Sequence, residues 1–326
     1  MEIVINQAIL HVLDTTLDAP VLSGAGMELT AEKTTYLQTH IEKLFASDEL
    51  RSCRFLPESA FAGELASNRD FVDFSCRVAG VMFDYMHAHP TIPSGDLAVA
   101  DFDCEGRPWL AVLKLNYKNG YVHFTEQTGG VQTNTLLQQR TCLPTQTGKV
   151  EEGALIDLDT GAVRLLEKKY DIDGKKDFYL STVVFQCSQT PPDRKKLAVI
   201  QQAAEQAVQD TYDGQEHVEA QVAMLIRNQA VDNKVSAEAV RRQLAEEFPL
   251  AAVPFDDYIE KSDAVDAAEP VTVTPARIRR MESRSIRSQS GIEVKIPAEL
   301  LASIEDVEFL HDPDGSVSVL IKNVLL

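Results

Sequence analysis

The spacing of apolar residues changes twice along this 326-residue chain, and these changes limit the folds open to it. Helical spacing dominates residues 30–89, strand-like runs follow from about residue 96 to 166, and helical spacing returns after Pro191-Pro192. Short turns between the strands favour antiparallel pairing. We therefore predict an α+β fold: an antiparallel sheet with flanking helices, then a helical segment and a small C-terminal α/β hairpin unit.

The first part of the chain, residues 1–190, is predicted to form an α+β N-terminal domain. It opens with a β-branched strand at Ile3–Leu13, and two helices follow, one capped by Thr30 and one running from about Asp70 to Met86. Strands at Asp96–Phe102 and Pro108–Tyr117 are expected to pair around a turn containing Gly106.

Two further turns are predicted in the same domain. Asn119-Gly120 is a strong hairpin signal, so Tyr121–Thr125 is expected to return beside the preceding strand, and residues 127–149 are expected to form a long loop. Asp159-Thr160-Gly161 is expected to join two short strands.

Residues 191–326 are predicted to form a C-terminal domain. Helical spacing continues to about residue 248, and Ser236 is positioned to cap one of the helices. Four prolines indicate a connector at residues 249–276. A basic segment at 277–290 precedes a strand–helix–hairpin unit at 291–326, with a helix expected at Pro297–Ser303 and a turn at Asp312–Gly315.

The bulk composition narrows the class of protein. Hydrophobic residues make up 44% of the chain, which is globular composition, and the net charge is -19. The N-terminus lacks the pattern of a signal peptide and no apolar run is long enough for a membrane span, so we expect a cytoplasmic protein without membrane contact. The five cysteines are widely spaced, which favours free thiols in a reducing compartment.

Arginines are concentrated in one short segment of this acidic chain. Five of them fall within eleven residues, opposed there only by Glu282, and they are Arg277, Arg279, Arg280, Arg284 and Arg287. Residues 204–269, just upstream, carry fifteen acidic and five basic side chains. A local cationic segment on an acidic chain suggests contact with a phosphate backbone or an acidic partner, and a solvated helix face or flexible connector is the alternative.

A second, weaker set of cations precedes it. Residues 164–196 hold eight basic and five acidic side chains. The candidate phosphate contacts among them are Lys168, Lys169, Lys175, Lys176, Arg194, Lys195 and Lys196. The last three begin a predicted helix, where the helix dipole disfavours cations. Two explanations for their position are a phosphate contact and a solubilising role.

No motif in the chain identifies a catalytic reaction or a cofactor. A single Asp159-Thr160-Gly161 is half of an aspartic-protease pair and fits a turn better. Asp171–Gly174 lacks most ligands of a calcium loop. Asp101 and Asp103, with Asp157 or Asp159, are the candidates for a divalent cation, against the alternative of solvated strand ends.

The order of several segments resembles a known family. The opening Ile5–Asp14, the Pro20–Ser23 piece before a helix containing His40–Lys43, and the run from Ile172-Asp173-Gly174 to Tyr179-Leu180-Ser181 are similar to the bacterial nucleoid-associated protein family of the NdpA/YejK type. The C-terminal strand Ile292–Ile296 and the hairpin that follows fit the same pattern. The resemblance implies a protein of the cytoplasm and nucleoid that associates with the chromosome and has no established catalytic activity.

Three hypotheses follow for the function. The first is a non-enzymatic nucleoid-associated protein whose arginine segment contacts DNA phosphates weakly, independently of sequence and in a salt-sensitive way. The second is an acidic interaction protein that docks on a DNA-handling enzyme through residues 204–269. The third is a metal-dependent enzyme. An exposed edge at the terminal strands also suggests a homodimer.

Overall fold

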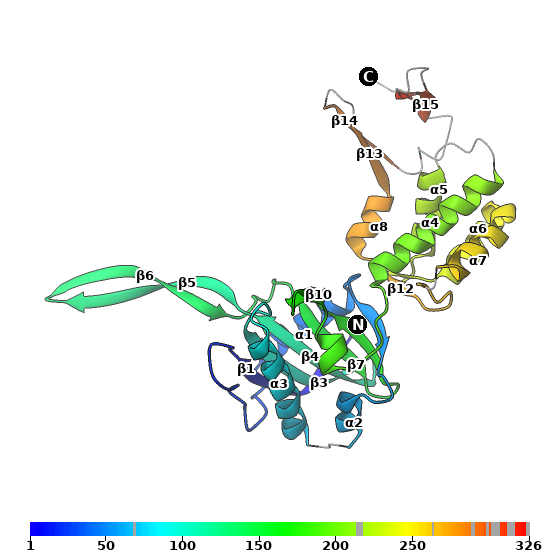
Figure 1. The fold of residues 1–326 in the computed structure, drawn as a ribbon. Helices are drawn as coiled ribbons and strands as arrows, with labels where there is room; N and C mark the ends of the chain where they lie inside the picture. Colours follow the sequence, from blue (N-terminus) through cyan, green and yellow to red (C-terminus); the bar gives the residue numbers. More distant parts are fainter. Residues whose placement is uncertain are drawn as a thin grey trace. The chain divides into compact units, whose positions relative to one another are not determined.

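The computed structural model describes residues 1–67, 70–212, 218–262, 264–287, 291–297, 300, 307–311 and 317–323. The chain divides into two compact units, unit 1 at Met1–Thr190 and unit 2 at Pro191–Leu326, and each is described by itself (Figure 1). An antiparallel six-stranded sheet with helices forms unit 1, and helices with short two-stranded sheets form unit 2. The predicted α+β class is confirmed.

The sheet of unit 1 has the order β1-β3-β4-β7-β8-β2, and every neighbouring pair is antiparallel. Its strands are β1 (Ile3–Leu13), β2 (Arg51–Arg54), β3 (Gly95–Cys104), β4 (Arg107–Asn116), β7 (Glu152–Asp157) and β8 (Ala162–Leu166). The two turns predicted between β3 and β4 and between β7 and β8 are present. Gly106 and Gly161 adopt positive φ there, as tight turns require.

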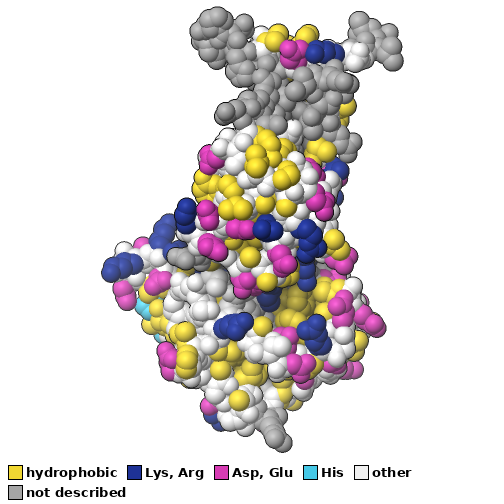
Figure 2. Space-filling model, turned by 90° about the vertical axis from the view of Figure 1, so that its right-hand side faces the viewer, with side chains coloured by type: hydrophobic (Ala, Val, Ile, Leu, Met, Phe, Trp, Pro, Cys, Tyr) yellow, Lys and Arg dark blue, Asp and Glu magenta, His cyan; other side chains and the backbone are white. Residues whose placement is uncertain are grey.

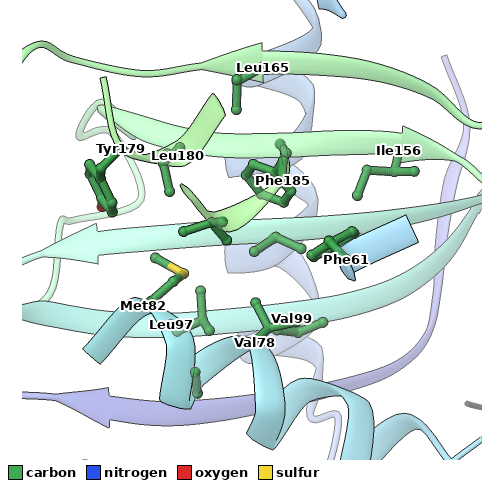
Figure 3. Close-up of a cluster of buried hydrophobic side chains, with 14 of the residues drawn as sticks. Phe61, Val78, Met82, Leu97, Val99, Ile156, Leu165, Tyr179, Leu180 and Phe185 are labelled. Atoms are coloured by element: carbon green, nitrogen blue, oxygen red, sulfur yellow. The ribbon is translucent and has the colours of Figure 1, made fainter. Parts of the chain in front are cut away.

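Helices cover both faces of this sheet, because the alternation of side chains along each strand gives it two apolar faces. The helices are α1 (Ala31–Phe45), α2 (Ala60–Ser67), α3 (Phe71–Ala88) and a π-helical turn η1 (Leu180–Val184). On β3, Leu97 faces the core shared with α2, α3 and η1 (Figure 3). Its neighbour Ala98 faces the core shared with α1. Thr30 and Asp70 cap α1 and α3 with their side chains.

A two-stranded ribbon, β5 (Lys118–Thr128) and β6 (Val131–Cys142), forms a sheet of its own. The prediction for this region was wrong in two respects. The chain does not turn back at Asn119-Gly120, and residues 127–149 are not simply a loop, because β6 occupies 131–142. The turn lies at Gly129-Gly130, where both residues have positive φ.

A smaller hairpin, β9 (Tyr170–Ile172) and β10 (Lys175–Asp177), precedes η1. Asp173 and Gly174 make its turn with positive φ.

Unit 2 begins with a helical cluster around a second apolar core. Its elements are α4 (Asp193–Thr211), α5 (Val218–Gln229), β11 (Lys234–Val235), α6 (Ala237–Glu247), the 3-10 turn η2 (Pro249–Ala251), α7 (Ala252–Glu260), β12 (Val271–Thr272) and α8 (Pro275–Met281). Residues 249–276 are therefore not a plain connector: Phe255, Ile259 and Val271 from this stretch are buried in the core.

The C-terminal part of unit 2 contains two antiparallel strand pairs, β13 (Ser283–Arg287) with β14 (Glu293–Pro297) and β15 (Val307–His311) with β16 (Val317–Ile321). The predicted strand near residues 292–296 and the final hairpin are confirmed. Residues 288–290, the helix expected at Pro297–Ser303 (except Pro297, which ends β14, and Leu300) and the turn at Asp312–Gly315 lie outside the described residues.

Candidate nucleic-acid interface and a buried polar cluster

Three of the five clustered arginines lie on the short helix α8. Thr274 caps this helix by accepting a hydrogen bond from the backbone N–H of Arg277 at 3.3 Å, and Pro275 follows in the first turn, where proline fits. Arg279 and Arg280 occupy the last turn, where the helix dipole favours cations. The local sequence therefore stabilises a helix that presents the arginine pair at its C-terminal end.

The packing of α8 decides which of its arginines reach solvent. Ile278 and Met281 pack against the core of unit 2 and fix one side of the helix. Arg279 and Arg280 are exposed, whereas Arg277 is half-buried. No carboxylate within the described parts of the chain lies at ion-pair distance from Arg279 or Arg280.

The other two arginines of the segment lie on the strand that follows. In the β13–β14 pair, Arg284 is opposite Ile296 and Arg287 is opposite Glu293. The described backbone from 275 to 287 is thus a helix followed by a strand, with only Glu282 between them. The segment is ordered as two elements of regular secondary structure instead of a connector.

The weaker basic set divides between the two units. In unit 1, Lys168 forms an ion pair with Glu151 at 3.1 Å, and the ammonium of Lys169 lies 4.8 Å from the centre of the Phe178 ring. Lys175 and Lys176 are exposed on β10.

In unit 2, Arg194 and Lys195 are exposed in the first turn of α4, but Lys196 is buried. The Lys196 ammonium donates to Glu269 at 3.1 Å, a residue 73 positions later. This internal ion pair gives Lys196 a structural reason to stand near a helix N-terminus, and it removes Lys196 from the surface.

The acidic residues proposed as metal ligands take part in local hydrogen bonds. Asn6 donates to Asp103 at 2.9 Å and Gln7 donates to Asp101 at 3.0 Å across β1 and β3. Asp157 accepts from the backbone N–H groups of Asp159 and Thr160 at 3.0 Å, which is a turn interaction.

The calcium-like segment has the same kind of explanation. Asp171 accepts from the backbone N–H of Gly174 at 3.0 Å within the β9–β10 turn. A group of three or more His, Cys, Asp or Glu side chains able to hold a metal ion is not found in the described part of the chain.

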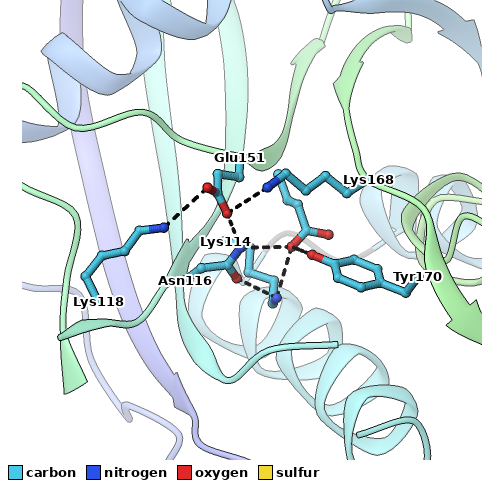
Figure 4. Close-up of polar contacts among 7 residues, drawn as sticks. Lys114, Asn116, Lys118, Glu151, Lys168 and Tyr170 are labelled. Carbon is cyan, nitrogen blue, oxygen red and sulfur yellow. Dashed lines mark hydrogen bonds and ion pairs between the residues drawn. The ribbon is translucent and has the colours of Figure 1, made fainter. Parts of the chain in front are cut away.

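The sequence analysis missed a buried polar cluster where β4 ends and β7 begins. Lys114 and Glu152, whose side chains are both 0% exposed, form an ion pair at 3.0 Å (Figure 4). Asn116 accepts from Lys114 at 2.6 Å and donates to Glu152 at 3.2 Å, while the Tyr170 hydroxyl donates to Glu152 at 2.8 Å. A lysine within the apolar run 110–115 was the signal that could have revealed this cluster.

Glu151 joins this buried pair to the surface. Its carboxylate interacts with Asn116 at 3.1 Å, Lys118 at 3.3 Å and Lys168 at 3.1 Å (Figure 4). Burial raises the pKa of Glu151, but these hydrogen bonds and charges outweigh burial and lower its pKa to about 2. Because Lys118 is the first residue of β5, Glu151 ties the root of the β5–β6 ribbon to the sheet.

The chemistry of the cluster is structural. Burial lowers the pKa of Lys114, and burial together with the nearby Glu152 raises the pKa of Tyr170. The enclosed Lys114 and Glu152 side chains offer no surface to a substrate. The ion pair instead holds β4, β7 and the β9 hairpin in register.

Two further observations bear on the class of protein. No described helix combines the length and the apolar character needed to cross a bilayer. A protein-family model described as NA37, nucleoid-associated protein YejK, matches residues 9–325, which is nearly the whole chain and confirms the resemblance seen in the sequence. No curated protein matches the chain.

Proposed function

Because the chain belongs to the family of nucleoid-associated protein YejK, we propose that it is a non-enzymatic protein of the bacterial nucleoid that contacts DNA phosphates directly through its arginine segment. The contact is independent of base sequence, since arginine on phosphate positions a protein without reading bases. The observation that carries the proposal is the exposed Arg279–Arg280 pair in the last turn of α8, followed at once by the two arginines of β13.

Electrostatics makes the contact local and weak. The chain as a whole carries a charge of -19 and repels a polyanion at long range. The repulsion is screened beyond about 8 Å at physiological salt, so a compact cationic segment still attracts phosphates at close approach. We expect the exposed Lys175, Lys176, Arg194 and Lys195 to add secondary contacts, without Lys196.

The test is a salt titration of DNA binding with a matched control. Each neutralised phosphate contributes about -0.9 to the slope of log K against log salt, so R279Q/R280Q should flatten the slope by about 1.8. The control is R241Q/R242Q, which removes the same charge from two arginines of α6. Both are already ion-paired, Arg241 with Asp256 at 2.8 Å and Arg242 with Glu238 at 3.7 Å.

The control should leave the slope nearly unchanged. Replacing all five clustered arginines should flatten the slope further, by up to about 4.5 when each neutralises one phosphate. An unchanged slope in that five-residue variant, or an equal effect of the control, would show that DNA contact does not run through this segment.

A second function is supported by a different surface of unit 2. Leu250 and Val253, each 66% exposed, lie beside the exposed acidic residues Glu246, Glu247 and Asp257. Figure 2, which faces the side of unit 2 that carries α6 and α7, shows apolar side chains bordered by acidic ones. An apolar centre with an acidic rim suits a basic, DNA-handling protein partner.

This alternative predicts a partner that stays bound after nuclease treatment. The variant L250K/V253K should release such a partner, whereas R279Q/R280Q should not. Loss of every partner upon nuclease treatment would leave direct DNA contact as the sole route to the nucleoid.

A further inference from the structure

The β5–β6 ribbon, here called the arm (residues 118–142), exposes an unusual amount of apolar surface. Six of its apolar side chains are between 48% and 73% exposed, and they are Tyr121, Val122, Phe124, Val131, Leu136 and Leu137. In Figure 1 the ribbon runs out from the six-stranded sheet of unit 1, and its residues are exposed along almost their entire length. Exposed apolar side chains concentrated on one element in this way mark an interaction site.

The strand register places apolar side chains on both faces of the arm. Val122 is opposite Leu137, so these two share one face with Phe124. Tyr121 is opposite Gln138 and Leu136 is opposite His123, which puts Tyr121 and Leu136 on the other face. Neither face is directed toward the core of unit 1.

The arm also leaves its backbone edges open. Among the described residues, β5 and β6 pair only with each other. An isolated two-stranded ribbon is marginally stable in water, and long unprotected edges are a template for another chain. The arm therefore has both the side-chain surface and the backbone edges of a strand-pairing element.

Charge indicates what covers the arm. Its only Lys, Arg, Asp or Glu residues are Lys118, Glu126 and Arg140, and Lys118 already pairs with Glu151. A ribbon that binds a nucleic-acid groove needs a basic stripe, and this one has none. The occupant is therefore a protein surface.

The identity of that protein follows from the rest of the chain. With a net charge of -19, two copies repel one another over most of their surface. The near-neutral arm, rich in Gln, Thr and Asn, is a surface through which two copies approach without that penalty. Uncharged hydrogen-bonding side chains around apolar anchors are also suited to self-pairing.

We propose that the arm binds a second copy of this chain in a reciprocal arm exchange with two-fold symmetry. The six apolar side chains expose roughly 100 Å² each, so the two arms together supply about 1,200 Å² of apolar surface. This area already reaches the lower limit of the total buried area in a specific interface. The Lys118–Glu151 pair attaches the root of each arm to the sheet of unit 1. This proposal does not depend on the DNA contact.

The experiment measures the mass of the full-length chain in solution across about 1–100 µM, without DNA. The wild type should approach twice the 36.0 kDa of one chain as its concentration rises. F124D/L137D, which places two charges on one face of the arm, should remain at the mass of a single chain. The matched control V231D changes an exposed apolar residue of unit 2 and should keep the wild-type behaviour.

Misfolding is monitored through Trp109, the only tryptophan, which lies on β4 outside the arm. At a concentration where the wild type is still a single chain, the arm variant should keep the wild-type unfolding midpoint, because its substituted residues do not pack in the core. A wild type that stays monomeric over the whole range, or a dimer that survives F124D/L137D, overturns the proposal. So does a monomeric wild type whose DNA affinity falls in the arm variant, since the arm would then bind nucleic acid.

Discussion

Removing the charge of Lys114 should destabilise unit 1 strongly, because it leaves the Glu152 carboxylate buried without its cation. At the 3.0 Å separation from Glu152, opposite charges attract by about 5 kcal/mol at an effective dielectric of about 20. In K114M the Glu152 carboxylate stays buried without its cation, although Tyr170 and Asn116 still donate to it. We therefore expect a loss of about 3–4 kcal/mol in the free energy of unfolding.

The assay is urea unfolding followed by tryptophan fluorescence. Trp109 lies in β4, the strand of Lys114, and packs edge-on against Phe45 with 5.1 Å between the ring centres. Its fluorescence therefore reports the unfolding of unit 1 alone. With a urea dependence of about 2 kcal/mol per molar, the midpoint of K114M should fall by about 1.5–2 M. E152Q should fall by a similar amount, because it leaves Lys114 charged and unpaired.

The double variant K114M/E152Q separates burial from pairing. It removes both charges, so its loss should be smaller than the sum of the two single losses by at least about 2 kcal/mol. K118M is the matched control, since it removes a half-exposed cation from the same cluster and should cost less than about 1 kcal/mol. Additive single losses, or a K114M midpoint equal to that of the wild type, would refute this reasoning.

Three further outcomes follow from other sites. The pKa of Glu151 lies below its ordinary value of 4.5, at about 2, so its contribution to the stability of unit 1 is present above pH 4.5 and is lost as pH falls toward 2. E151Q should be less stable than the wild type by about 1–2 kcal/mol at neutral pH, and the urea midpoints of the two proteins should converge between pH 4.5 and 2. K196Q breaks the buried pair with Glu269, so amide hydrogen exchange in α4 should accelerate at least tenfold, while the Trp109 midpoint stays constant. G130V places a β-branched residue at a φ of 82°, at a cost of about 1–2 kcal/mol, and should speed amide hydrogen exchange in the arm without moving the Trp109 midpoint. Equal exchange rates in G130V and the wild type would contradict the requirement for glycine in this turn.

Local rules predicted elements whose ends are set by their own residues. The strand Ile3–Leu13 has the predicted bounds, and Thr30 and Ser236 cap helices as expected. Capping depends on a hydrogen bond three residues away, so a short stretch of sequence is enough to identify it.

The failures occurred where distant contacts override a local signal. Asn119-Gly120 did not return the chain along β4, because β3 and β7 already occupy both edges of that strand. Three of the four prolines of the expected connector instead lie in the first turn of a helix, as Pro249 does in η2 and Pro275 in α8, where a missing N–H has no cost.

The candidate site shows the same limit. The sequence located the arginine segment by its charge, but exposure depends on how α8 packs through Ile278 and Met281. Lys196 could not be separated from Lys195 without knowing that Glu269 lies beside it. The arm was missed because its few apolar residues, diluted by Gln and Thr, are typical of a loop in composition.

The order of strands in the sheet has a consequence for synthesis of the chain. The two strands made first, β1 and β2, form the outer edges, and their partners lie far along the chain: Leu13 pairs with Gly95, Ile3 with Cys104 and Arg51 with Leu165. Such long-range closure is slow compared with hairpin formation. On the ribosome, β3 and β4 should therefore assemble a central template first, and a nascent chain halted before β8 should expose the apolar edge of β7 and be prone to aggregate.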